Sequence, residues 1–77
     1  MGMRDDIWAD KAKRLLRAEM VKHGVSYEEL SERLGKMGIE DTPVNLRNKV
    51  ARGKFMASFF LQCLAAMGVQ VVRLEDA

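Results

Sequence analysis

The chain has 77 residues, which is enough for one domain with a thin core. Hydrophobic residues make up 48% and charged residues 31%, a globular composition that excludes a disordered chain. The net charge is only +2, no apolar run approaches the ~18–20 residues that span a bilayer, and a single cysteine cannot form an intrachain disulfide. We therefore expect a cytoplasmic protein made of a single domain, residues 1–77.

The first predicted helix covers residues 6–22. Its apolar residues recur at spacings of three and four and form one stripe, made of Trp8, Ala12, Leu15, Leu16 and Met20. Gly24 follows as the residue beyond the C-cap, and His23 just before it suits the negative end of the helix dipole. We therefore assign His23 no catalytic role.

The second predicted helix begins after Ser26, which forms a capping box with Glu29. Val25 and Leu30 are placed to form a hydrophobic staple. Gly35 lies inside the helical pattern, where glycine costs about 1 kcal/mol relative to alanine, so we expect close backbone packing there. Gly38 is the expected end of the helix. The predicted buried stripe consists of Tyr27, Leu30, Leu34 and Met37.

The third predicted helix lies within the stretch TPVNLRNKVARGKF (residues 42–55), which contains four cations and no carboxylate. Thr42 is a good N-cap, Pro43 suits the first helical position, and Gly53 closes the helix. Leu46 and Val50 point to one side, so at 100° per residue Asn45, Asn48 and Arg52 lie on the other. Arg47 and Lys49 flank the two edges. No carboxylate occurs from residue 42 to 74. This asymmetry predicts an anionic partner, because a solvated helix usually mixes charges of both signs.

The fourth predicted helix covers residues 56–67 and is apolar on nearly all sides. A chain of 77 residues can hardly surround such a helix, so we expect a homodimer with Phe59, Phe60 and Val71 at its interface. Residues 69–74 form either a short strand that pairs with its twin in the dimer, or a final helical turn with Val69, Val71 and Leu74 packed inward.

No pattern of catalytic or metal-ligating residues occurs in the sequence. There is no paired acid and base, no glycine-rich phosphate loop and no cluster of metal ligands. Cys63 lies in an apolar helix without a neighbouring base and is interpreted as a small core residue. We therefore expect no enzyme activity, no catalytic residue, no metal and no cofactor.

Residues from about Leu15 to Leu74 resemble the lambda-repressor/Cro-like (xenobiotic-response-element type) helix–turn–helix domain. The matching pieces are LLRAEMVKHGVSYEELSERLG, a second helix that ends in ARGK, and a helix that ends in AAMGV. The chain is also similar to a small family of uncharacterised bacterial domains with the run VNLRNKVARGKF. It departs from the repressor-like pattern in two ways: KMGIEDT lengthens the turn before Pro43, and Pro43-Val44 replaces the usual polar start of the recognition helix.

The resemblance implies an all-α fold of four to five short helices around a helix–turn–helix, with a short C-terminal strand as one option. It also implies sequence-specific or general binding of double-stranded DNA, as a small transcriptional regulator acting through residues 42–53. By position, the residues facing bases would be Thr42, Val44, Asn45 and Asn48. Those facing the DNA backbone would be Arg47, Lys49, Arg52 and Lys54. The alternative is a protein-interaction module that keeps the fold without binding DNA and whose basic face docks an acidic protein partner.

Overall fold

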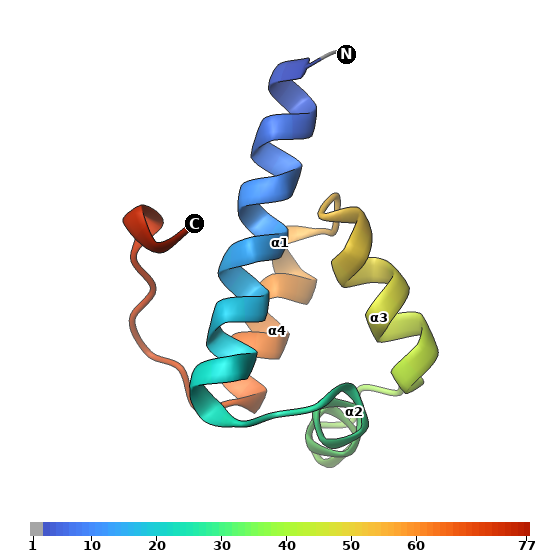
Figure 1. Cartoon of the computed structure of the whole chain (residues 1–77). Coiled ribbons are helices and arrows are strands. Elements are labelled where there is room, and N and C mark those ends of the chain that lie inside the picture. Colours follow the sequence, from blue (N-terminus) through green and yellow to red (C-terminus); the bar gives the residue numbers. More distant parts are fainter. Residues whose placement is uncertain (1–2) are drawn as a thin grey trace.

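Four α-helices and one short 3-10 helix make up the computed structural model, which describes the backbone of residues 3–77 and the side chains of residues 6–77. The elements are α1 (Met3–His23), α2 (Tyr27–Lys36), α3 (Pro43–Arg52), α4 (Ala57–Ala66) and the 3-10 helix η1 (Leu74–Asp76). Residues 3–77 contain no strand, so the fold over this range is all-α and the strand considered for residues 69–74 does not form. In Figure 1, α3 and the C-terminal segment lie on opposite sides of α1.

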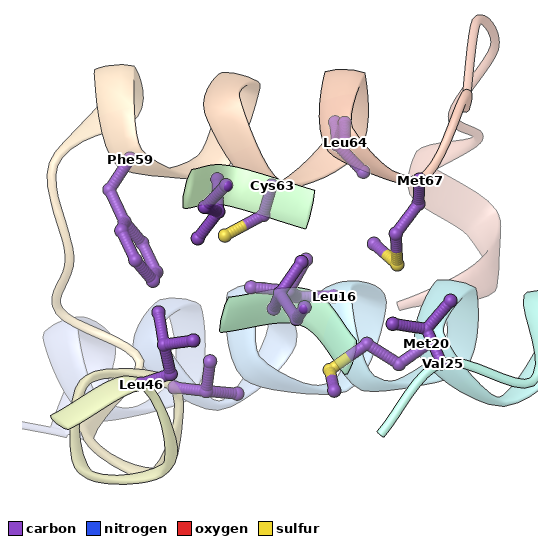
Figure 2. Packing of buried hydrophobic residues seen from close by; sticks show 11 residues of the cluster. Leu16, Met20, Val25, Leu46, Phe59, Cys63, Leu64 and Met67 are labelled. Carbon is purple, nitrogen blue, oxygen red and sulfur yellow. The ribbon is translucent and has the colours of Figure 1, made fainter. Parts of the chain in front are cut away.

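One hydrophobic cluster joins all four α-helices. Figure 2 shows Cys63 of α4 pointing toward Leu16 of α1, and Met67, just beyond the end of α4, pointing toward Met20. Phe59 of α4 points toward Leu46 of α3. The cluster consists of Leu16, Met20, Val25, Leu30, Leu34, Leu46, Val50, Phe59, Cys63, Leu64 and Met67. Leu30, Leu34 and Leu46, which the sequence placed on the inner sides of their helices, are all buried, which confirms the predicted facing of α2 and α3 at these positions. Leu64 of α4 is buried as well.

The start of α2 forms as the sequence predicted, although only half of the capping box is made. The Ser26 hydroxyl accepts a hydrogen bond from the Glu29 backbone N–H at 3.1 Å, and Val25 and Leu30 are both buried beside it. The Glu29 carboxylate turns forward to Arg33, at 2.6 Å, instead of back to the cap. The helix start is therefore held by the hydroxyl and the staple.

The lengthened connection between α2 and α3, residues 37–42, is held by hydrogen bonds at both ends. At its start, the Ile39 and Gly38 N–H groups donate to the carbonyls of Leu34 and Gly35, at 2.9 and 3.0 Å, and Gly38 has φ 85°. This is a Schellman ending, and Ile39 packs against the core beside it. At its end, the Ser31 hydroxyl donates to the Asp41 carbonyl at 2.6 Å. The extra residues therefore form an ordered support for the start of α3.

Gly53 fixes the end of α3 against α1. It adopts φ 69° at the C-cap, and a Cβ atom built on it would lie 2.0 Å from the carbonyl oxygen of Ala9. Only glycine permits this backbone approach, because it has no side chain and tolerates the left-handed conformation. The α3–α4 turn is therefore positioned by backbone contact with α1.

Several sequence predictions about facing were wrong. Trp8 is 65% exposed, because the first turns of α1 extend beyond the helices that pack on it (Figure 1), and Met37 is 46% exposed at the end of α2. Gly35 packs against nothing, since a Cβ there would meet no atom within 4 Å. In the C-terminal segment, Val71 and Leu74 are 75% and 81% exposed, so they do not pack inward.

Candidate nucleic-acid interface

The eight residues that the sequence predicted for DNA contact are all exposed around α3 and its two ends. Leu46 and Val50 on the opposite side have no exposed surface and anchor the helix to the core. Asn48 therefore lies at the centre of the outward face, with Val44 and Asn45 beside it. Thr42 also has a structural role, because its hydroxyl accepts a hydrogen bond from the Asn45 N–H at 3.1 Å as the N-cap.

Two of the four predicted phosphate-contacting cations are paired with carboxylates in the free chain. Lys49 Nζ lies 2.6 Å from Asp41, whose side chain is only 8% exposed, and Lys54 Nζ lies 3.7 Å from Asp6. The chain brings these acids in from the α2–α3 connection and from α1, so the absence of carboxylates between residues 42 and 74 does not make the surface purely cationic. Arg47 and Arg52 form no ion pair with any of the described side chains.

One edge of α3 meets the start of α2 and the end of α1. The Arg47 guanidinium lies 5.3 Å from the centre of the Tyr27 ring, and Arg17 of α1 joins it in lining an open hollow of about 570 Å³. Sequence reasoning missed Arg17. Its position outside the apolar stripe of α1 was the available signal, but the stripe alone could not show that the end of α1 lies beside α3. Glu28 also lines this hollow, so the edge is mainly, not purely, cationic.

The other edge of α3 meets the start of α4. Lys49, Arg52 and Lys54 line a hollow of about 230 Å³ there, with an apolar floor of Phe55, Met56 and Phe59. Met56, the N-cap of α4, provides no side-chain hydrogen bond, and the first turn contains no acidic residue. The first N–H groups of α4 are therefore left for an outside acceptor, and the helix dipole favours an anion there. The sequence could not reveal this edge, because it depends on how α4 is placed beside α3.

The residues predicted for a dimer interface differ in their surroundings. Phe59 is 8% exposed and belongs to the core of its own chain, where Lys49 Nζ lies 4.9 Å from its ring centre. Phe60 is half-buried and stacks with Phe55 at 5.9 Å between ring centres. Val71 is largely exposed and belongs to the C-terminal segment, which lies on the opposite side of α1 from α3 (Figure 1). Phe59 is therefore mainly a packing residue and offers little surface to a partner.

The remaining candidates for chemistry are inert or solvated. Burial raises the pKa of the Cys63 thiol to about 12, so this sulfur stays protonated at neutral pH. His23 lies 3.6 Å from the buried Glu19 carboxylate at the end of α1. The described side chains contain no group of three or more potential metal ligands. Within residues 3–77, no helix is both long and apolar enough to cross a membrane.

The chain belongs to the DUF6471 family, a domain of unknown function, which matches it over residues 8–72. This match covers most of the chain, including all of α2, α3 and α4 and most of α1. It accounts for the similarity to an uncharacterised family that the run VNLRNKVARGKF indicated. No curated protein and no solved structure matches the chain significantly.

Proposed function

We propose that this DUF6471 protein binds double-stranded DNA through α3 as a small transcriptional regulator. The arrangement on α3 carries the proposal: an amide face is bordered by cations on both edges. Asn45 and Asn48 have the paired donor and acceptor that suit an adenine edge in the major groove. The cations of the two edges suit the phosphates on either side of that groove.

The supports of α3 favour the same function. Base readout needs a helix that is held firmly while its outer face stays free. Here Leu46 and Val50 anchor the helix, the hydrogen bonds of residues 37–42 hold its start, and Gly53 holds its end. The uncapped backbone N–H groups at the start of α4 lie beside Arg52 and Lys54. Together they could donate hydrogen bonds to one more phosphate.

The test measures binding to a random-sequence duplex by fluorescence anisotropy at several salt concentrations. We expect a steep loss of affinity with salt, because each neutralised phosphate contributes a slope of about −0.9 in log K against log salt. Arg52→Ala should reduce this slope by about one unit on all sequences. Arg73→Ala is the matched control, since Arg73 is an exposed arginine in the C-terminal segment, across α1 from α3, and should leave the slope unchanged.

Asn48→Ala separates base readout from phosphate contact. On a selected preferred sequence this change should cost about 1–3 kcal/mol of binding free energy, with little effect on random duplex. If the wild-type protein does not bind any duplex at low salt and micromolar concentration, DNA binding is excluded.

A second candidate function is docking of an acidic protein partner on the same face. The observation that favours it is that Lys49 and Lys54 already bind carboxylates within the free chain. In that case the Arg52→Ala variant would lose affinity for an acidic peptide instead of duplex DNA. Measuring Arg52→Ala and its control Arg73→Ala against both duplex DNA and an acidic peptide therefore distinguishes the two functions.

A further inference from the structure

An apolar groove lies between α1, the start of α4 and the C-terminal segment. It has a volume of about 600 Å³, and its lining includes Trp8, Leu15, Phe55, Phe60 and Leu74. Trp8 and Leu74 line it although they are 65% and 81% exposed. Each therefore presents a large apolar surface to water, which is unfavourable in a monomer and typical of a binding surface.

The charges along the groove match those of a second copy of the same surface. Lys11 lines it from α1 and Glu75 lines it from η1, so the groove carries one cation and one carboxylate on different elements. In a two-fold symmetric contact, the residues of one copy meet the same surface of the other, so each Lys11 can face the partner's Glu75. In the free chain Lys11 lies against the Trp8 ring, 5.6 Å from its centre, and forms no ion pair with the described side chains, while Glu75 makes an exposed contact of 3.5 Å with Arg73.

We propose that this groove is the contact surface of a two-fold symmetric homodimer, in which Trp8 and Leu74 of each copy are buried against the groove of the other. The interface would thus lie on α1 and η1, with Phe60 at its floor, rather than on Phe59. The C-terminal segment that borders the groove lies across α1 from α3 (Figure 1), and the outward residues Val44, Asn45 and Asn48 do not line the groove. Phe55 lines both the groove and the hollow at the α3–α4 edge, so the two surfaces are neighbours there, while pairing leaves the outward face of α3 exposed. The inference does not depend on DNA binding.

Trp8 is the only tryptophan of the chain and therefore reports on the contact directly. On dilution of the wild-type protein, we expect its fluorescence emission to shift to longer wavelength as the dimer dissociates and the ring returns to water. Sedimentation over the same concentrations should show the mass falling from twice the chain mass to the chain mass. A monomer at all concentrations up to about 100 times those used for DNA binding would overturn the proposal.

Two apolar substitutions locate the contact. Trp8→Ser and Leu74→Ser should each weaken the dimer, Trp8→Ser by about 30-fold or more, since buried tryptophans are typical hot spots. Val21→Ser removes a side chain of α1 that is 80% exposed but outside the groove, and should leave dimerisation unchanged. Circular dichroism checks that each variant is folded. A dimer that survives both groove substitutions would place the interface elsewhere and leave the groove to another occupant.

A charge exchange tests the predicted pairing. Lys11→Glu and Glu75→Lys should each weaken the dimer by roughly 2- to 30-fold, because the pair occurs twice in a symmetric interface. The double variant should recover most of the wild-type affinity. Failure of the double variant to recover would contradict the pairing of Lys11 with Glu75. Duplex binding of a monomeric groove variant is measured separately, so either proposal can fail without the other.

Discussion

Two glycines of this protein have opposite surroundings, and their substitution should have opposite effects. Gly53 adopts φ 69° with the Ala9 carbonyl in the space where a Cβ would be, whereas Gly35 lies inside α2 with nothing within 4 Å of that position. In the sequence, both glycines look alike, because each interrupts the spacing of helix-forming residues. Only the three-dimensional arrangement separates a required glycine from a replaceable one.

We expect Gly35→Ala to stabilise the fold by about 0.5–1 kcal/mol, because alanine loses less backbone entropy in a helix. Gly53→Ala should destabilise it by more than the about 1–2 kcal/mol that a left-handed non-glycine residue costs, since it also displaces α1. Urea unfolding followed by circular dichroism gives both free energies. Equal effects of the two changes would show that the surroundings of the glycines do not govern their roles.

The buried thiol of Cys63 makes the free energy of unfolding change with pH in the alkaline range. Its pKa is raised from 9.0 to about 12, mainly by burial and also by the Asp41 carboxylate, while the Lys49 ammonium acts in the opposite direction. The folded chain therefore holds the thiol proton at pH values where the unfolded chain has lost it. The resulting stabilisation is complete below pH 9 and is lost as the pH rises toward 12.

We expect the free energy of unfolding to fall between pH 9 and 11 more steeply in the wild type than in Cys63→Ala, by up to about 1.4 kcal/mol per pH unit. Comparing the two proteins cancels the titration of the lysines.

In a separate measurement at pH 8, a thiol reagent should modify Cys63 only as fast as the chain opens. Parallel pH profiles would mean that the thiol is accessible to water.

At the scale of the helices, the local signals predicted α2 and α3 well. Ser26 and Thr42 are the N-caps that the sequence indicated, and the glycines at 38 and 53 follow the helix ends. These features depend on residues within one turn of each other, which is why a single sequence reveals them. The facing of Trp8 was wrong because periodicity defines a stripe but not how far the neighbouring helices extend along it.

Thr42 provides a test that separates its cap role from a role in binding. Thr42→Ala should cost about 1 kcal/mol of stability, whereas Thr42→Asp should keep the cap, because aspartate accepts the same N–H and favours the helix dipole. The aspartate variant should still weaken duplex binding, since it adds a negative charge to the proposed interface. Thermal unfolding and anisotropy give the two results. Loss of stability in Thr42→Asp would contradict the cap role.

At the scale of the whole molecule, the limits of sequence reasoning concern contacts between distant segments. The exposure of the α3 face followed from Leu46 and Val50, because a helix of known facing leaves only one other side. The ion pair of Lys49 with Asp41, the place of Arg17 beside Arg47, and the groove between α1 and η1 did not follow. Each depends on packing angles and on the path of connections, which residue spacing does not determine.

The single core cluster means that one cavity should weaken the whole fold. Leu46→Ala removes a fully buried side chain where α3 meets the core, and we expect a cost of about 2–5 kcal/mol. Val44→Ala, on the outward face of the same helix, should change stability by less than about 0.5 kcal/mol. Thermal unfolding of both variants checks the expectation. A similar cost for the two changes would contradict the orientation of α3.

The contact of Gly53 with the backbone of α1 has a consequence for protein engineering. The support at the end of α3 involves backbone atoms, and the outward side chains at positions 44, 45 and 48 contribute nothing to the core cluster. A library that randomises these three positions therefore keeps both the anchors and the support of the helix. Such a library could be selected for new recognition properties without redesign of the scaffold, with Gly53 and Leu46 held constant in every member.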